Sequence, residues 1–152
     1  MSQSINLVAY ETTSDGKLYE TKTDLIETAF VTTDLLAELQ KVSPLIEREI
    51  FEVVGSEEHY LIECFNDSDV GSVINRLEDI FLSVLKSDGE KLLGNADSQD
   101  SESLPSLHSA HIKSSDISES ISRFRTLTNI IYIFNLKNNQ YGDDSSVVLK
   151  LG

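Results

Sequence analysis

The chain has a single cysteine, Cys64, among its 152 residues, so an internal disulfide is impossible and an oxidising compartment is not implied. It also lacks the run of about 18 apolar residues that a membrane-spanning helix requires. The N-terminal sequence MSQSINLVAYE has no basic stretch followed by an apolar segment, which a secretory leader would show. These absences predict a cytoplasmic protein in which Cys64 packs rather than reacts.

Short catalytic motifs are absent as well. The sequence contains no G-x-S-x-G, no C-x-x-C and no glycine-rich loop that would cradle a phosphate. We therefore expect a protein that is not an enzyme and that carries no cofactor and no metal.

Basic residues are scarce, with 12 Lys and Arg against 26 Asp and Glu, and the formal net charge is −14. The excess acid lies in residues 1–102, which hold 22 acidic and 7 basic residues, whereas residues 103–152 hold 4 and 5. Such a surface repels nucleic acid and anionic membranes and attracts basic proteins. Solubility alone is the alternative explanation of the charge.

The length suits one domain spanning residues 1–152. Alternating apolar residues in 5–10 and the segment 17–22, joined by turn residues, predict an opening β-hairpin. Apolar residues at helical spacing predict two helices, over 23–30 and 32–42, and Pro44 closes the second.

The rest of the chain gives a second hairpin, a long helix, a loop and two further strands. A hairpin is predicted for 46–54 and 59–65, a helix for 68–87, a Ser/Asp-rich loop for about 95–120 and strands for 126–136 and 147–151. The element order is then β-β-α-α-β-β-α-loop-β-β. This order predicts an α+β fold, with a mainly antiparallel sheet of five to six strands and two to three helices packed against it.

Two groups of histidines are candidates for chemistry. His108 and His111 form H-x-x-H, with Asp116 as a third possible ligand, but a serine-rich loop would not hold these rings in place. We therefore expect solvated loop histidines rather than a metal site.

His59 belongs to the second hairpin. If Val54 pairs with His59, one face carries Phe51, Val53, Tyr60, Ile62 and Cys64 and forms the core side, with Glu49 at its far end. The other face carries Arg48, Ile50, Glu52, Val54, His59, Leu61 and Glu63. A histidine between the carboxylates of Glu52 and Glu63 would have a raised pKa and suit acid–base catalysis. An exposed polar face, with Arg48 diagonal to Glu63, is the alternative that we favour.

The clearest candidate for a binding site is a cluster of acidic residues around this hairpin. Its members are Glu47, Glu49, Glu52, Glu57, Glu58, Glu63, Asp67 and Asp69. A cluster of this sign suits a partner rich in lysine or arginine. We therefore expect a small acidic binding protein that recognises and neutralises a basic protein, such as a nuclease toxin, similar in size and charge to bacterial immunity and inhibitor proteins.

Two other functions stay open. An acidic secretion chaperone or adaptor would hold an exported or partly folded client, and it predicts a homodimer with an exposed apolar groove. A hydrolase-type enzyme would use His59, or His108 and His111 with the long loop as a lid.

Overall fold

The computed structural model describes residues 3–97 and 107–152, and its side chains over residues 3–90 and 117–152. The elements, in chain order, are β1 (Gln3–Thr12), β2 (Leu18–Val31), α1 (Thr33–Val42), β3 (Ile46–Phe51), β4 (His59–Cys64), the 3-10 helix η1 (Asp67–Asp69), α2 (Val70–Asp97), α3 (Leu107–Gln140) and β5 (Val147–Leu151). The α+β class is therefore confirmed.

The five strands close into a barrel in the order β1-β2-β3-β4-β5. All neighbouring strands run antiparallel except β2 and β3, which run parallel and pair at Leu18–Ile50 and Tyr19–Phe51. α1 connects β2 to β3 along the chain. Four of the five strand pairings are thus antiparallel as predicted, and the pairing of β2 with β3 is not.

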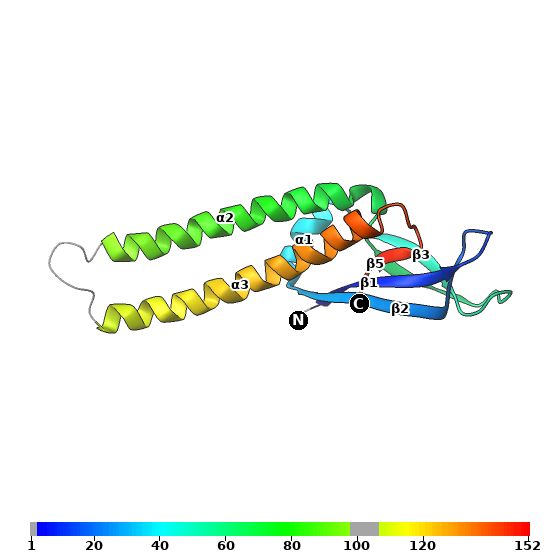
Figure 1. Ribbon diagram of the computed structural model, residues 1–152, viewed down its shortest axis with the longest axis horizontal. Helices are drawn as coiled ribbons and strands as arrows, with labels where there is room; N and C mark the ends of the chain where they lie inside the picture. The colour runs from blue at the N-terminus through cyan, green and yellow to red at the C-terminus, as the bar shows by residue number, and fades with distance from the viewer. Residues whose placement is uncertain (1–2, 98–106) are drawn as a thin grey trace.

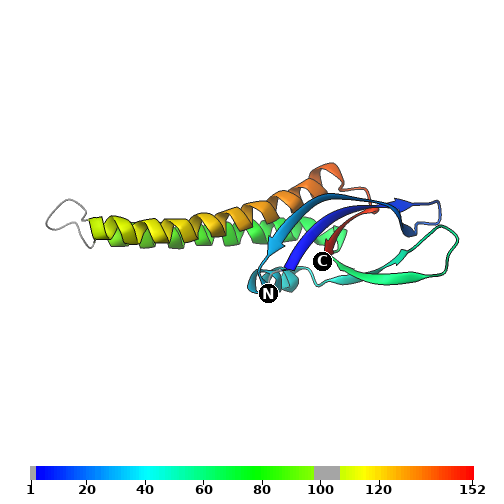
Figure 2. The ribbon, with the colours of Figure 1, turned by 90° about the horizontal axis from the view of Figure 1, so that it is seen from below.

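The two long helices form an antiparallel hairpin that covers one side of β1, β2 and β5 and then extends past the barrel (Figure 1). Figure 2 shows the same projection from below. The turns that join β1 to β2 and β3 to β4 lie together at the other end of the molecule. Gly16 and Gly55 occupy these turns with φ of 78° and 86°, a conformation that glycine adopts without strain.

Two apolar clusters stabilise this arrangement. Inside the barrel, Tyr10, Leu18, Ile50, Ile62, Cys64 and Val148 are buried together. Between the sheet and the helices lies a larger cluster that includes Ile5, Leu7, Leu77, Ile130, Phe134 and Leu149. Neighbours such as Val148 and Leu149 face opposite ways because side chains alternate along a strand. β5 is therefore buried on both faces, as its sequence VVLKL suggests.

The prediction of a helix over 23–30 is wrong, because this segment continues β2. It pairs with β1 from Val8–Leu25 to Ser4–Phe30, and Ala29 and Val31 face the core. An isolated helix of eight residues has little stability of its own, and pairing with β1 outweighs its local apolar spacing. The following helix is confirmed as α1, capped by the Thr32 side chain, which accepts a hydrogen bond from the Leu35 amide.

The strand predicted over 126–136 is also wrong, because this segment belongs to α3. Its buried residues, Leu127, Ile130, Ile133 and Phe134, recur at the three- and four-residue spacing of a helix. The loop predicted for 95–120 is replaced by helix over 95–97 and 107–120, and residues 98–106 lie outside the described part. The helix predicted over 68–87 is confirmed as α2, which continues to Asp97.

The β3–β4 hairpin exists, but its predicted register is wrong by three residues. Phe51, not Val54, pairs with His59, and Ile50 pairs with Tyr60. The turn is longer than four residues, so that Arg48 and Ile50 share the inner side with Ile62. Tyr60, Ile62 and Cys64 do face the interior as predicted, whereas Val53 lies in the turn and is exposed.

Candidate functional site

Six of the predicted acidic residues line the outer side and the tip of the β3–β4 hairpin. We call this set the acidic face: Glu47, Glu49, Glu52, Glu57, Glu58 and Glu63. All six side chains are exposed. The tip belongs to the end of the molecule opposite the projecting helices (Figure 1). A partner bound there would leave the helical hairpin uncovered.

Strand register brings like charges together on the outer side. Glu47 of β3 stands directly opposite Glu63 of β4, a pairing of like charges that destabilises a sheet. Glu49 stands beside this pair, and its carboxylate oxygen lies 3.8 Å from Nε2 of His59. The outer side is therefore rich in negative charge that the fold itself does not neutralise.

A second group of carboxylates meets at the tip. A hydrogen bond with Glu58 and the charge of Glu58 raise the pKa of Glu52, and Glu20 of β2 adds to this effect. Glu20 also contributes to a raised pKa at Tyr60, where burial is the main cause. Burial raises the pKa of the deeper Tyr10 to about 12, with Tyr60 and Glu20 contributing. Glu20 contributes to all three shifts and adds to the negative potential at the mouth of the barrel, although burial is the main cause at the two tyrosines.

A hollow of about 470 Å³ adjoins the acidic face. Its lining combines Glu47 and Glu49 with apolar side chains, among them Phe51 and Leu61. Leu61 is 55% exposed, so the hollow offers an apolar surface next to two carboxylates. This combination suits the long side chain of lysine or arginine, whose stem is apolar and whose end is charged.

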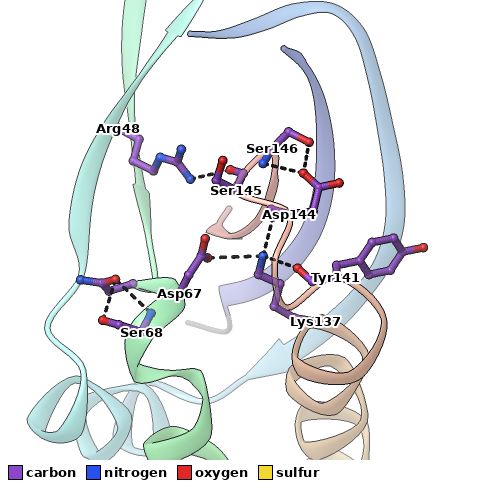
Figure 3. Close-up of polar contacts among 9 residues, drawn as sticks. Arg48, Asp67, Ser68, Lys137, Tyr141, Asp144, Ser145 and Ser146 are labelled. Carbon is purple, nitrogen blue, oxygen red and sulfur yellow. Dashed lines mark hydrogen bonds and ion pairs between the residues drawn. The ribbon is translucent and has the colours of Figure 1, made fainter. Parts of the chain in front are cut away.

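The hollow is also lined by two cations, Lys17 and Arg48, and both are already engaged. Lys17 lies over the Phe51 ring, with Nζ 4.8 Å from the ring centroid. Arg48 donates a hydrogen bond to the Ser145 carbonyl from the inner side of the hairpin (Figure 3). Their contacts leave the six carboxylates in excess over nearby positive charge.

Asp67 and Asp69 lie at the base of the hairpin, away from its tip. Figure 3 shows Asp67 turned toward Lys137 of α3, with Oδ1 3.5 Å from the ammonium. Asp69 accepts a hydrogen bond from the Ser43 hydroxyl at 3.1 Å. Both carboxylates are half-buried and have partners within the fold, whereas the six carboxylates of the acidic face are exposed.

Lys137 itself is 1% exposed, and its surroundings show that it stabilises structure. Its ammonium donates hydrogen bonds to the carbonyls of Tyr141, at 2.9 Å, and Asp144, at 2.8 Å. The Asp67 carboxylate forms an ion pair with the same ammonium, with Oδ1 3.5 Å from Nζ. Lys137 therefore closes the C-terminal end of α3 and pairs it with Asp67 of η1.

The predicted histidine sites are not assembled among the described side chains. His59 and Glu63 share a side of β4 but stand four residues apart, about 13 Å along the strand. Glu52 lies beyond the paired strand, and the carboxylate near His59 is Glu49. His108 and His111 fall within the helical backbone of α3, but their side chains and that of Asp116 lie outside the described part. The described residues contain no group of three or more His, Cys, Asp or Glu side chains able to hold a metal ion.

Sequence reasoning missed the contribution of the β1–β2 hairpin to this end of the molecule. The charge of Glu20 helps to raise the pKa of Glu52 at the tip, and Lys17 lies over the Phe51 ring. Both follow from the parallel pairing of β2 with β3, a long-range contact with no local signal in the sequence.

No helix in the described part of the chain is long and apolar enough to cross a membrane. No protein-family model, curated protein or solved structure matches this chain.

Proposed function

We propose that the protein is a small acidic binding protein that recognises and neutralises a basic protein, in the manner of an immunity protein or toxin inhibitor. The observation that carries this proposal is the grouping of like charges on the acidic face. Glu47 opposes Glu63 across the ladder, and Glu58 raises the pKa of Glu52 at the tip. These contacts are unfavourable in the isolated protein, and a cation placed between the carboxylates would relieve them.

The shape of the surface supports the same class of partner. The hollow beside Glu47 and Glu49 can take the apolar stem of a lysine or arginine, while the carboxylates pair with its charge. The net charge of −14 accelerates the encounter with a basic protein, and salt screens the attraction. Binding there would cover the basic surface with which a nuclease holds its substrate.

Charge reversal at the tip tests the location of binding. We expect Glu57→Lys combined with Glu58→Lys to weaken binding of a lysine-rich peptide about tenfold or more at low salt. The control combines Glu119→Lys with Asp143→Lys, which changes the net charge equally at exposed sites outside the β3–β4 hairpin. Titration calorimetry at two salt concentrations measures both. Equal weakening by the two variants would show that net charge alone attracts the peptide, and would refute the assigned surface.

Neutralisation needs a separate measurement. Basic proteins recovered with the wild-type chain from its native cells should include a nuclease whose activity the wild-type chain inhibits. The variant with Glu57→Lys and Glu58→Lys should inhibit the same nuclease far less than the control variant does. Recovered nuclease that stays fully active when bound would argue against an inhibitor.

A second function, that of a secretion chaperone or adaptor, is favoured by a different feature. A cavity of about 400 Å³ opens between α1, α2 and α3, and its lining includes Leu35, Ile80, Val84 and Leu127. An apolar cavity open to solvent could hold apolar side chains of a partly folded client.

The two functions make opposite predictions for Val84→Glu, which places a charge in this cavity. A chaperone should lose its ability to prevent aggregation of a partly unfolded client, as light scattering would show. An inhibitor that works through the acidic face should keep its affinity for a basic partner. Ala37→Glu, on the exposed side of α1, is the control for the added charge.

A further inference from the structure

The projecting part of the helical hairpin exposes four large apolar side chains. Leu82 and Leu85 of α2 are 60% and 48% exposed, and Ile117 and Ile121 of α3 are 43% and 52% exposed. The members of each pair are three or four residues apart, so each pair lies on one side of its helix. The ring contact between Phe81 and Phe124, with centroids 5.3 Å apart, sets the two helices side by side at this level.

The four side chains share the side of the hairpin that faces away from α1. Arg76 contacts Glu38 of α1, and Ile80 and Val84 line the cavity against α1. At about 100° per residue, Leu82 and Leu85 point about half a turn away from these positions. On α3, Arg123 and Thr126 line the same cavity. Ile117 and Ile121 point about half a turn away from these two residues around the helix. We call this set, Leu82, Leu85, Ile117 and Ile121, the outer apolar flank.

Charges around Leu82 are arranged so that the surface complements itself. Glu78 lies one turn before Leu82 and Lys86 one turn after it, and both side chains are exposed. Neither has a hydrogen-bond or ion-pair partner among the described side chains. A two-fold axis at Leu82 would set a second α2 antiparallel to the first, with each Glu78 against the Lys86 of the other copy.

Overall charge also permits two copies to meet here. Residues 1–69 hold 15 acidic and 4 basic residues, whereas residues 70–140 hold 9 and 7. The helical hairpin is therefore close to neutral, and an antiparallel arrangement sends the acidic barrels to opposite ends. Residues 70–90 of α2 span about 30 Å, and two helices side by side are about 20 Å wide. This gives about 600 Å² for each copy, near the lower range of stable interfaces.

We propose that the outer apolar flank binds a second copy of this chain, forming an antiparallel four-helix dimer centred on Leu82. Apolar side chains are buried at its centre, and two symmetry-related Glu78–Lys86 pairs fix its register. The acidic faces remain free at the two far ends, so the dimer presents two binding surfaces for basic partners. The dimer does not depend on the proposed function of the acidic face.

Reciprocal charge reversal tests the register of this dimer. Sedimentation equilibrium of the full chain should show a dimer at concentrations of about tens of micromolar. Either Glu78→Lys or Lys86→Glu should weaken it about tenfold, because each change turns two attractive pairs into repulsive ones. The double reversal should restore the dimer to near wild-type affinity. Glu119→Lys, an exposed reversal on the opposite side of α3, should have little effect.

Leu82→Gln tests the apolar centre, and we expect it to abolish the dimer at the concentrations that support it in the wild-type chain. Circular dichroism and urea unfolding at low concentration show whether each variant keeps its fold. A wild-type chain that stays monomeric at its solubility limit would overturn the proposal. A dimer that folded variants at Glu78, Lys86 and Leu82 leave unchanged would also overturn it, since the copies would then meet elsewhere.

Discussion

The ammonium of Lys137, near the end of α3, lies 3.5 Å from the Asp67 carboxylate at the start of the helical region, 70 positions earlier in the chain. Lys137 is also bonded to two carbonyls of the segment that leads into β5. One buried charge thus holds together the beginning of the helical hairpin, its end and the last strand of the barrel.

Removing this ammonium should destabilise the fold strongly. Lys137→Met keeps much of the apolar stem but leaves the Asp67 carboxylate and two carbonyls without their donor. We expect a loss of about 3 kcal/mol in the free energy of unfolding, measured in urea. Asp67→Asn is the control, because it keeps the two carbonyl bonds, and it should cost about 1 kcal/mol. Equal losses would show that the carbonyl bonds contribute little.

A second buried charge connects α2 and α3 at a greater distance from the barrel. Asp88 of α2 is 4% exposed, and it accepts hydrogen bonds from the Ser120 hydroxyl at 2.7 Å and from the Arg123 guanidinium at 3.1 Å. Asp88→Ala should destabilise the protein by about 2 kcal/mol, and Ser120→Ala by about 1 kcal/mol. A double-mutant cycle between Asp88 and Arg123 measures the coupling energy of this pair. We expect this energy to be smaller than the loss caused by Asp88→Ala, because Arg123 is half-exposed. An additive cycle would mean that Ser120 is the important partner of Asp88.

The parts of the fold that sequence predicts well are those whose signals are local. Thr32 caps α1 and Pro44 follows it, and both features are visible in the sequence. The last strand has the predicted bounds, residues 147–151, because its apolar run is short and follows a clear turn. The buried stripe of α2 is likewise visible as a repeat of three and four residues.

Errors arise where apolar residues are too dense to show a period. Between Ile130 and Phe134 only Tyr132 is well exposed, and the run resembles a buried strand. The helix is evident from the buried residues Leu127, Ile130 and Phe134, which lie three and four residues apart. The acidic face was predictable as a set of charges, but the Glu47–Glu63 pairing depends on a register that the sequence does not determine.

Cys64 should be unreactive in the folded protein. It is fully buried in the barrel, and burial raises the pKa of its thiol to about 11, an effect that nearby Arg48 opposes and Asp67 reinforces. Little thiolate therefore exists at neutral pH, and reagents cannot reach it. Iodoacetamide should modify Cys64 only after unfolding in urea, as mass spectrometry would show. Rapid modification of the native chain at pH 7 would mean that the barrel opens readily.

The carboxylates at the tip should give the protein an unusual response to pH. Glu58 raises the pKa of Glu52 above its value in the unfolded chain, so the folded state binds protons more tightly at this site. By linkage, the contribution of this pair to stability is present at acidic pH and is lost as pH rises through the raised pKa. Glu52→Gln removes the repulsion, and it should increase the urea midpoint at pH 7 but not at a pH below the carboxyl range.

Glu57→Gln removes an equal charge from the same turn and serves as the control for net charge. If both variants raise the midpoint equally at pH 7, the gain comes from lower overall charge rather than from contact between Glu52 and Glu58. If the effect of Glu52→Gln is specific, a basic partner bound at the tip should abolish it, because a cation between the carboxylates relieves the same repulsion. Stability measured with and without a lysine-rich peptide therefore connects the pH response of the tip to its proposed role in binding.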